Sequence, residues 1–199
     1  EEVIPFLLGD DNDVIALAQT GTGKTAAFGL PILQKIDVTT YHPQALVLCP
    51  TRELCLQIAD DLNDYSKYID NLKVLPVYGG SSIESQIKTL KRGVHVVVAT
   101  PGRLLDLMNR KTVDLSLVKN VIMDEADEML NMGFTDSINA ILAEVPENRN
   151  MLLFSATMPK EIANITKKYM KNPKEIVIGN KNEGNKNIRD IYYLSLIHI

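Results

Sequence analysis

The sequence predicts an α/β domain in which helices cover both faces of a doubly wound, mainly parallel sheet. Short runs rich in Val, Ile and Leu alternate with amphipathic helical stretches almost from end to end of the 199 residues. Several of these runs are nearly continuous in apolar residues, which is typical of parallel strands buried on both faces. This alternation favours strands that are joined by right-handed helical crossovers.

The strand and helix predictions follow the hydrophobic pattern in chain order. Strands are expected at Asp13–Ala18, Ala45–Cys49, Lys73–Tyr78, His95–Ala99, Asn120–Met123, Met151–Ser155 and Glu175–Ile178. Helices are expected at Lys24–Ile36, Glu53–Tyr68, Ile83–Lys91, Arg103–Asn109, Thr135–Glu144 and Lys160–Met170, with a further helix around Val3–Leu8. In the helix that begins at Glu53, apolar residues repeat at the spacing of one helical face, so that face should contact the sheet.

These elements predict one domain over residues 1–178, with a truncated N-terminus because Glu1 is an unusual first residue. Residues 179–193 are interpreted as a linker, since the stretch after Ile178 is rich in Gly, Asn and Lys and ends the regular pattern. Residues 194–199 resemble the translation of a sequencing-library adapter, and a genuine continuation of a strand is the alternative.

Composition favours a soluble globular protein, with 45% hydrophobic and 23% charged residues. Apolar runs such as Val94–Ala99 are far too short to cross a bilayer, and no secretory signal opens the chain. Cys49 and Cys55 lack the spacing of a metal site. A disulfide between them is one interpretation, but a reducing cytosol is the simpler context, so a cytoplasmic location is expected.

The net charge of −4 argues against non-specific electrostatic binding of nucleic acid by the surface as a whole. Any binding of nucleic acid would therefore have to come from local sites. Lysines crowd the stretch from Lys167 to Lys186, and a solvated face explains that run about as well as RNA contacts do. His95 stands inside an apolar strand and is interpreted as structural.

A glycine-containing segment between the first strand and the following helix predicts a phosphate-binding loop. Its residues are Ala18, Gln19, Thr20, Gly21, Thr22, Gly23, Lys24 and Thr25. Glycines let the backbone wrap phosphate oxygens, and the new helix presents free N–H groups at the positive end of its dipole. Lys24 would reach the β- and γ-phosphates, and the Thr25 hydroxyl would ligate Mg²⁺. The strict pattern begins with Gly, where this chain has Ala18.

The apolar strand Asn120–Met123 runs directly into the acidic segment Asp124-Glu125-Ala126-Asp127. Carboxylates then lie at the carboxyl edge of a parallel sheet, which is where ligands of α/β domains bind. Asp124 can hold Mg²⁺ through its water shell, and Glu125 can orient or deprotonate the attacking water. Compensation of a helix dipole is the alternative for such an acidic segment. The acidic segment and the phosphate loop together predict a nucleoside triphosphate hydrolase.

The Asp-Glu-Ala-Asp run is where a family resemblance enters. From Glu1 to about Tyr193 the chain resembles the DEAD-box ATP-dependent RNA helicases of bacterial type, and specifically their N-terminal RecA-like, phosphate-loop domain. The motifs that carry the resemblance stand in the family's order: Ala18–Thr25, Pro50-Thr51-Arg52-Glu53-Leu54, Gly79-Gly80, Thr100-Pro101-Gly102-Arg103, Asp124–Asp127 and Ser155-Ala156-Thr157.

The resemblance implies that ATP and Mg²⁺ are the cofactors and that the RNA backbone is bound without reading sequence. The implied RNA-binding residues are Pro50, Thr51, Arg52, Gly79, Gly80, Thr100, Pro101, Gly102 and Arg103. Several of these follow strands, so they should gather on one rim, and Thr51 and Thr100 are expected to cap the helices that follow them. Helix N-termini and guanidinium groups suit phosphates, although ordinary turn and cap chemistry is the alternative.

The resemblance also implies that Ser155, Ala156 and Thr157 couple the nucleotide state to RNA strand separation, through hydrogen bonds towards Asp127. The alternative is a Ser/Thr turn before the helix that Pro159 begins. The family's adenine-reading Gln motif and its second RecA-like domain, with the arginine fingers, lie outside this sequence. Two other functions remain open from the residues: a DNA translocase, and a binding module for RNA or protein without turnover.

Overall fold

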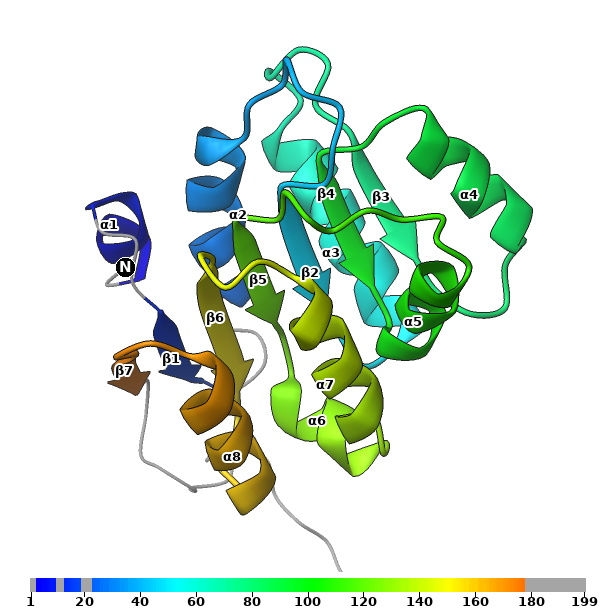
Figure 1. The fold of residues 1–199 in the computed structure, drawn as a ribbon. Helices are drawn as coiled ribbons and strands as arrows, with labels where there is room; N and C mark the ends of the chain where they lie inside the picture. The colour runs from blue at the N-terminus through cyan, green and yellow to red at the C-terminus, as the bar shows by residue number, and fades with distance from the viewer. Residues whose placement is uncertain (1–2, 10–12, 19–22, 178–199) are drawn as a thin grey trace, which may run out of the picture.

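The computed structural model describes residues 3–9, 13–18 and 23–177. They form a sheet of seven parallel strands with helices on both faces (Figure 1). The strands are β1 (Val14–Leu17), β2 (Ala45–Leu48), β3 (Val74–Val77), β4 (Val96–Ala99), β5 (Asn120–Met123), β6 (Asn150–Ser155) and β7 (Lys174–Val177), in the spatial order β3-β4-β2-β5-β6-β1-β7. The predicted fold class is confirmed.

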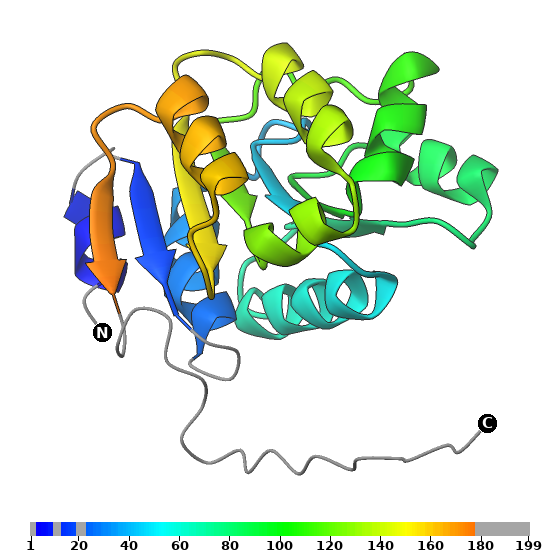
Figure 2. The same cartoon turned by 90° about the horizontal axis from the view of Figure 1, so that it is seen from below.

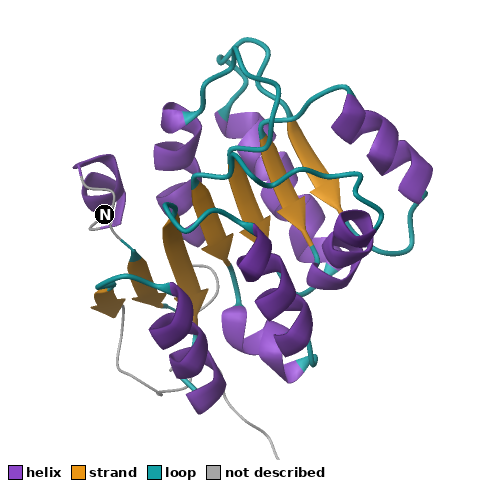
Figure 3. Cartoon of the chain, viewed as in Figure 1, coloured by secondary structure: helices purple, strands orange, loops and turns teal. Residues whose placement is uncertain are grey.

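The helices lie in two layers, one on each face of the sheet (Figures 2 and 3). One layer holds α1 (Val3–Gly9), α2 (Lys24–Lys35) and α3 (Arg52–Tyr65). The other holds α4 (Ile83–Lys91), α5 (Pro101–Asn109), α6 (Ala126–Asn131), α7 (Thr135–Glu144) and α8 (Lys160–Tyr169). Side chains along each strand alternate between the layers: Leu46 and Leu48 of β2 join one core, and Ala45 and Val47 join the other.

Every predicted strand is present, and most element bounds lie within two residues of the expectation. The helix predicted to run to Tyr68 ends at Tyr65, because Ser66 leaves helical geometry and its carbonyl accepts the N–H of Ile69 in a turn. The short helix α6 was not predicted as a separate element. It ends at Asn131, and Gly133, which follows the C-cap residue Met132, has a φ of 82°, a left-handed conformation that glycine adopts without strain. The linker and adapter predictions, residues 179–199, lie outside the described residues.

The strand order sets which loops meet. β1 lies next to β6, while the chain crosses over β6 and β5 to reach β2. The loops after β1, β5 and β6 are therefore neighbours at the carboxyl edge of the sheet. The loops after β2, β3 and β4 occupy the other half of the same edge, because all strands point the same way. No helix in the described ranges is long and apolar enough to cross a membrane.

His95 is fully buried just before β4, and its Nδ1 accepts the backbone N–H of Lys73 at 3.0 Å. Burial lowers the pKa of His95 below its ordinary value of 6.5. The unfolded chain therefore binds more protons than the folded one just below pH 6.5, so this contribution to stability is present above pH 6.5 and is lost as the pH falls.

We expect His95→Asn to lower the melting temperature at pH 7.5, because it removes part of a buried side chain. We also expect it to flatten the decline of melting temperature between pH 7.5 and 5.5, where one such group contributes at most about 1.4 kcal/mol per pH unit. Thermal unfolding followed by circular dichroism measures both, with His42→Asn as the control at an exposed histidine. An equal pH slope in wild type and His95→Asn would contradict this account.

Candidate functional site

The described part of the phosphate loop lies between β1 and α2. The backbone N–H of Ala18 donates to the carbonyl of Ser155 at 3.0 Å, which fixes the start of the loop against the end of β6. Gly23 ends the loop with φ of 77°, a left-handed conformation that favours glycine, and α2 begins at the next residue. Gln19, Thr20, Gly21 and Thr22 lie outside the described residues.

Lys24 and Asp124 come together where the phosphate loop meets the end of β5. Their Nζ and Oδ1 atoms are 3.4 Å apart, and their side chains are only 10% and 3% exposed. Burial raises the pKa of Asp124, and the Lys24 ammonium opposes that rise. The ion pair brings the predicted phosphate-binding cation and the predicted metal-binding carboxylate to one place.

Glu125 follows Asp124 in a left-handed conformation with φ of 52°. Its backbone N–H donates to the Asp124 carboxylate at 3.0 Å, which helps to hold this turn at the end of β5. Non-glycine residues in this region of backbone space are uncommon and often mark functional sites. Burial raises the pKa of the Glu125 carboxyl, and Lys24 again opposes the rise. A carboxyl group with a raised pKa beside a cation is suited to accept a proton.

Hydrogen bonds join the acidic segment to the end of β6. The buried Ser155 hydroxyl accepts the backbone N–H of Asp127 at 3.3 Å. The Asp127 carboxylate accepts the backbone N–H of Thr157 at 2.9 Å and its hydroxyl at 2.8 Å. The hydrogen bonds expected between these residues are thus present, while their role in coupling stays a prediction.

The predicted RNA-binding segments contact one another at the other half of the carboxyl edge. The Arg52 guanidinium lies 4.9 Å from the centre of the Tyr78 ring, next to Gly79 and Gly80. Gly80 has φ of 82°, and a Cβ there would lie 3.7 Å from an Arg52 nitrogen. Arg103 donates from one nitrogen to the Ser81 carbonyl and to Gln86 Oε1, both at 3.1 Å. These segments gather on one rim, as expected.

The two predicted threonine caps differ. The Thr51 hydroxyl accepts the backbone N–H of Leu54 at 3.3 Å, so Thr51 caps α3 as predicted. The prediction for Thr100 is wrong, because its side chain makes no capping hydrogen bond to α5. Pro101 is the first residue of α5 and has no N–H, so this helix begins with one donor fewer to satisfy.

Gln86 also belongs to this rim, although no motif in the sequence predicts it. Its amide nitrogen donates to the Tyr78 carbonyl at 3.2 Å and to the Ser81 hydroxyl at 2.7 Å, while its oxygen accepts from Arg103. Gln86 is only 6% exposed. It stands on the side of α4 that faces the turn after β3, and only the three-dimensional arrangement identifies it as a support for Arg103.

A parallel sheet with a phosphate loop after β1 and an acidic segment after β5 defines a nucleotide-binding domain of the RecA-like class. Comparison with known proteins makes the class specific. The model of the DEAD/DEAH box helicase family matches residues 1–165, and the chain belongs to this family.

Similar proteins include ATP-dependent RNA helicase DeaD of Mycobacterium tuberculosis, which is 52% identical over 95% of this chain and 33% of its own length. DEAD-box ATP-dependent RNA helicase CshA of Streptococcus pneumoniae is 54% identical over 98% of this chain and 36% of its own length. The chain thus spans about a third of the length of these curated relatives.

Solved structures agree with the fold. A DEAD box protein from Methanococcus jannaschii superimposes with a TM-score of 0.84 at 46% identity, over 88% of this chain and 48% of that one. A hypothetical ATP-dependent RNA helicase from Sulfolobus tokodaii gives a TM-score of 0.80 at 44% identity, over 89% of this chain and 51% of that one.

Proposed function

We propose that this chain is the nucleotide-binding domain of an ATP-dependent RNA helicase and that it acts together with a second RecA-like domain of the same protein. It binds ATP with Mg²⁺ and contacts the RNA backbone, and hydrolysis is coupled to local separation of RNA strands. The observation that carries the proposal is the Lys24–Asp124 ion pair, which brings the phosphate loop and the acidic strand end into one site. The names of the similar helicases support the choice of ATP and RNA.

Lys24 and Thr25, with the loop backbone, bind the phosphates in this proposal, and Thr25 and Asp124 hold the metal. These residues fit a Mg²⁺ ion, because Asp124 is a buried carboxylate. Among the described ion pairs, its one cationic partner is the Lys24 ammonium. The described residues contain no cluster of His, Cys, Asp and Glu able to hold a metal by themselves. A site completed by phosphates and water is typical of Mg²⁺, which neutralises charge on the phosphates.

Glu125 acts on the attacking water in this proposal. Burial raises the pKa of the Glu125 carboxyl, which makes its carboxylate a stronger base than that of an exposed glutamate, and the Lys24 ammonium opposes that rise. Asp127, Ser155 and Thr157 lie one turn further along and connect the acidic segment to β6. A shift of the acidic segment on hydrolysis would therefore move the residues that follow β6, which is how we expect the nucleotide state to reach the RNA.

The RNA contacts are proposed for the rim formed by Arg52, Gly79, Gly80 and the start of α5. This rim offers backbone amides and two guanidinium groups, which suit phosphates and carry no sequence information. Local contacts of this kind agree with a net charge of −4. A cytoplasmic location is part of the same proposal, and both cysteines are free thiols.

Arg52→Ala and Arg103→Ala should each weaken RNA binding to a similar degree across unrelated sequences, and should spare ATP affinity. The two variants should differ in thermal stability. Arg52 is exposed and loses only its contact with Tyr78, whereas loss of Arg103 removes two hydrogen bonds and leaves Gln86 without a partner for its oxygen. We expect Arg103→Ala to cost about 1–2 kcal/mol, a decrease of a few degrees in melting temperature.

Fluorescence anisotropy with several RNA sequences, together with thermal unfolding, tests these expectations. A changed order of preference among the RNA sequences in either variant would show that the arginines contact bases. An equal melting temperature for the two variants would show that the Arg103 hydrogen bonds do not stabilise the rim.

The proposed function is tested by duplex unwinding with the intact protein. A short RNA duplex with a labelled strand should separate with ATP and Mg²⁺, and should stay paired with ADP or without nucleotide. Tight binding of RNA with no strand separation and no hydrolysis would instead identify a binding module without turnover. Separation of DNA duplexes in preference to RNA would identify a DNA translocase.

A further inference from the structure

Phe134 connects the acidic segment to one of the proposed RNA-binding segments. Its ring carbon Cε1 would lie 3.8 Å from a Cβ atom placed on Gly102, so the edge of the ring covers that glycine. Gly102 is the second residue of α5 and directly precedes Arg103. Phe134 is half-buried and packs against the core between the sheet and the layer that holds α4 to α8. The contact therefore joins the loop after α6 to the start of α5.

Backbone hydrogen bonds make residues 125–134 one compact unit. The Glu125 carbonyl accepts the N–H of Met129 at 3.1 Å, and the Met129 carbonyl accepts the N–H of Phe134 at 3.1 Å. The Phe134 carbonyl accepts the N–H of Ile138 at 2.9 Å, in the first turn of α7. Ala126 and Met129 are fully buried, and a packed interior transmits a displacement with little loss. A movement of Glu125 is therefore carried to Phe134.

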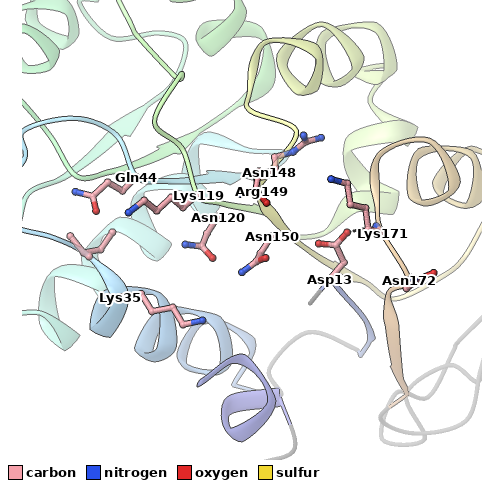
Figure 4. A pocket seen from close by; sticks show the side chains of 11 residues that line it. Asp13, Lys35, Gln44, Lys119, Asn120, Asn148, Arg149, Asn150, Lys171 and Asn172 are labelled. Carbon is pink, nitrogen blue, oxygen red and sulfur yellow. Dashed lines mark hydrogen bonds between the residues drawn. The ribbon is translucent and has the colours of Figure 1, made fainter. Parts of the chain in front are cut away.

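Hydrogen bonds hold the opposite edge of the sheet in place (Figure 4). The Asp13 carboxylate, just before β1, accepts the backbone N–H of Met151 in β6 at 2.6 Å and that of Lys171 after α8. The Lys171 ammonium donates to the Glu147 carbonyl at 3.0 Å. These bonds tie the amino ends of β1 and β6 to the end of α8. A displacement that begins at Glu125 should therefore appear at the carboxyl edge and leave the amino edge in place.

Arg103 has two possible sets of partners, which gives this connection the two-state element that coupling between sites requires. In this structure one nitrogen of its guanidinium donates to the Ser81 carbonyl and to Gln86 Oε1, both at 3.1 Å. An RNA phosphate would compete for the same guanidinium, because a charged oxygen is a stronger acceptor than a neutral carbonyl. The Phe134 ring lies against the residue before Arg103. A small shift of the ring can therefore change which set of partners is favoured.

We propose that Phe134 is a positioning residue that couples the nucleotide state to RNA binding through Arg103. This inference rests on the proposed helicase function, because it requires that ATP and RNA bind at the two sites described above. In the ATP-bound state, residues 125–134 hold the start of α5 where Arg103 reaches a phosphate. After hydrolysis these residues shift, the ring moves against Gly102, and Arg103 returns to its protein partners. The route is separate from the hydrogen bonds that join the acidic segment to β6.

The test measures how much a non-hydrolysable ATP analogue tightens RNA binding by the intact protein, with fluorescence anisotropy of a labelled single-stranded RNA. The ratio of the dissociation constants without and with the analogue is the coupling between the two sites. We expect Phe134→Leu to reduce this ratio at least about threefold, a modest value for a residue that carries coupling. RNA affinity without nucleotide should stay near the parental value. Phe134→Tyr keeps the ring and should keep the parental ratio.

Tyr169→Leu is the matched control for loss of a ring. Tyr169 is also a half-buried aromatic residue packed against the same core, but it is the last residue of α8 and lies far along the chain from the acidic segment. Leucine fills most of the lost volume at either position, so both variants should fold, which thermal unfolding checks. In an Arg103→Ala background, adding Phe134→Leu should lower the ratio no further, because the two residues act in one route.

The outcomes separate this inference from the proposed function. An unchanged ratio in Phe134→Leu, or an equal loss in Tyr169→Leu, would overturn the role of Phe134 and leave the helicase proposal standing. A further loss in the double variant would overturn the route through Arg103. A parental protein whose RNA affinity ignores the ATP analogue would overturn the helicase proposal together with this inference.

Discussion

Replacing Lys24 with alanine should reduce ATP turnover by the intact protein at least about 100-fold, the scale seen when one stabilising group is removed from a charged transition state. Lys24 is the cation that meets the Asp124 carboxylate at 3.4 Å, and it begins the helix that follows the phosphate loop. Without it, the β- and γ-phosphates lose their positive partner. Nucleotide affinity should fall as well, which titration with a fluorescent ATP analogue would measure.

The fold should survive this change, because Asp124 can take up a proton once its cation is gone. Burial already raises the pKa of Asp124, and Lys24 opposes that rise, so its removal raises the pKa further. Lys91→Ala, at the exposed end of α4, is the control for loss of a lysine. Hydrolysis at the parental rate in Lys24→Ala would refute the assignment of the phosphate loop.

Replacing Glu125 with glutamine should separate binding from chemistry, with hydrolysis slower by about 10² to 10⁴. Glutamine keeps the size of the side chain and its capacity for hydrogen bonds but cannot take a proton from water. The intact variant should therefore bind ATP and RNA together and release the RNA slowly. Phosphate release and RNA dissociation measure the two effects on the same preparation.

Glu128→Gln provides the matched control for the same chemical change. Glu128 lies three residues further on in α6 and is exposed, so its replacement should leave both rates near the parental values. Parental hydrolysis in Glu125→Gln would show that Glu125 is not the base. Equal losses in the two variants would point to the net charge of the acidic segment instead.

The local hydrophobic pattern of the sequence was sufficient to predict most of the fold, because the parallel strands are buried on both faces. Runs such as Val96–Ala99 and Asn120–Met123 are buried along their whole length, so hydrophobicity alone marked them. The short helix α6 was harder to predict, since it has only six residues and depends on Gly133 for its end. A helix this short gains its stability from packing and has little periodic signal.

The candidate site divides in the same way. Lys24 and Asp124 stand in motifs that predict their chemistry from the sequence. Their contact depends only on the strand order that the fold class implies. Thr100 and Gln86 show what a motif cannot supply. The missing cap of Thr100 depends on local backbone geometry, and the link from Gln86 to Arg103 depends on how α4 packs beside the turn after β3.

We have proposed that this chain is one of two RecA-like domains of an RNA-stimulated ATPase, and phosphate release with and without single-stranded RNA tests that proposal most directly. The measurement compares the 199-residue chain with the intact protein under the same conditions. In the proposed mechanism the second RecA-like domain supplies an arginine finger, and such a group is worth about 10³ to 10⁵ in rate in related phosphoryl transfers. We predict strong stimulation by RNA in the intact protein and hardly any turnover by the chain, with or without RNA. Robust RNA-stimulated turnover by the chain alone, or an intact protein whose rate ignores RNA, would contradict the account.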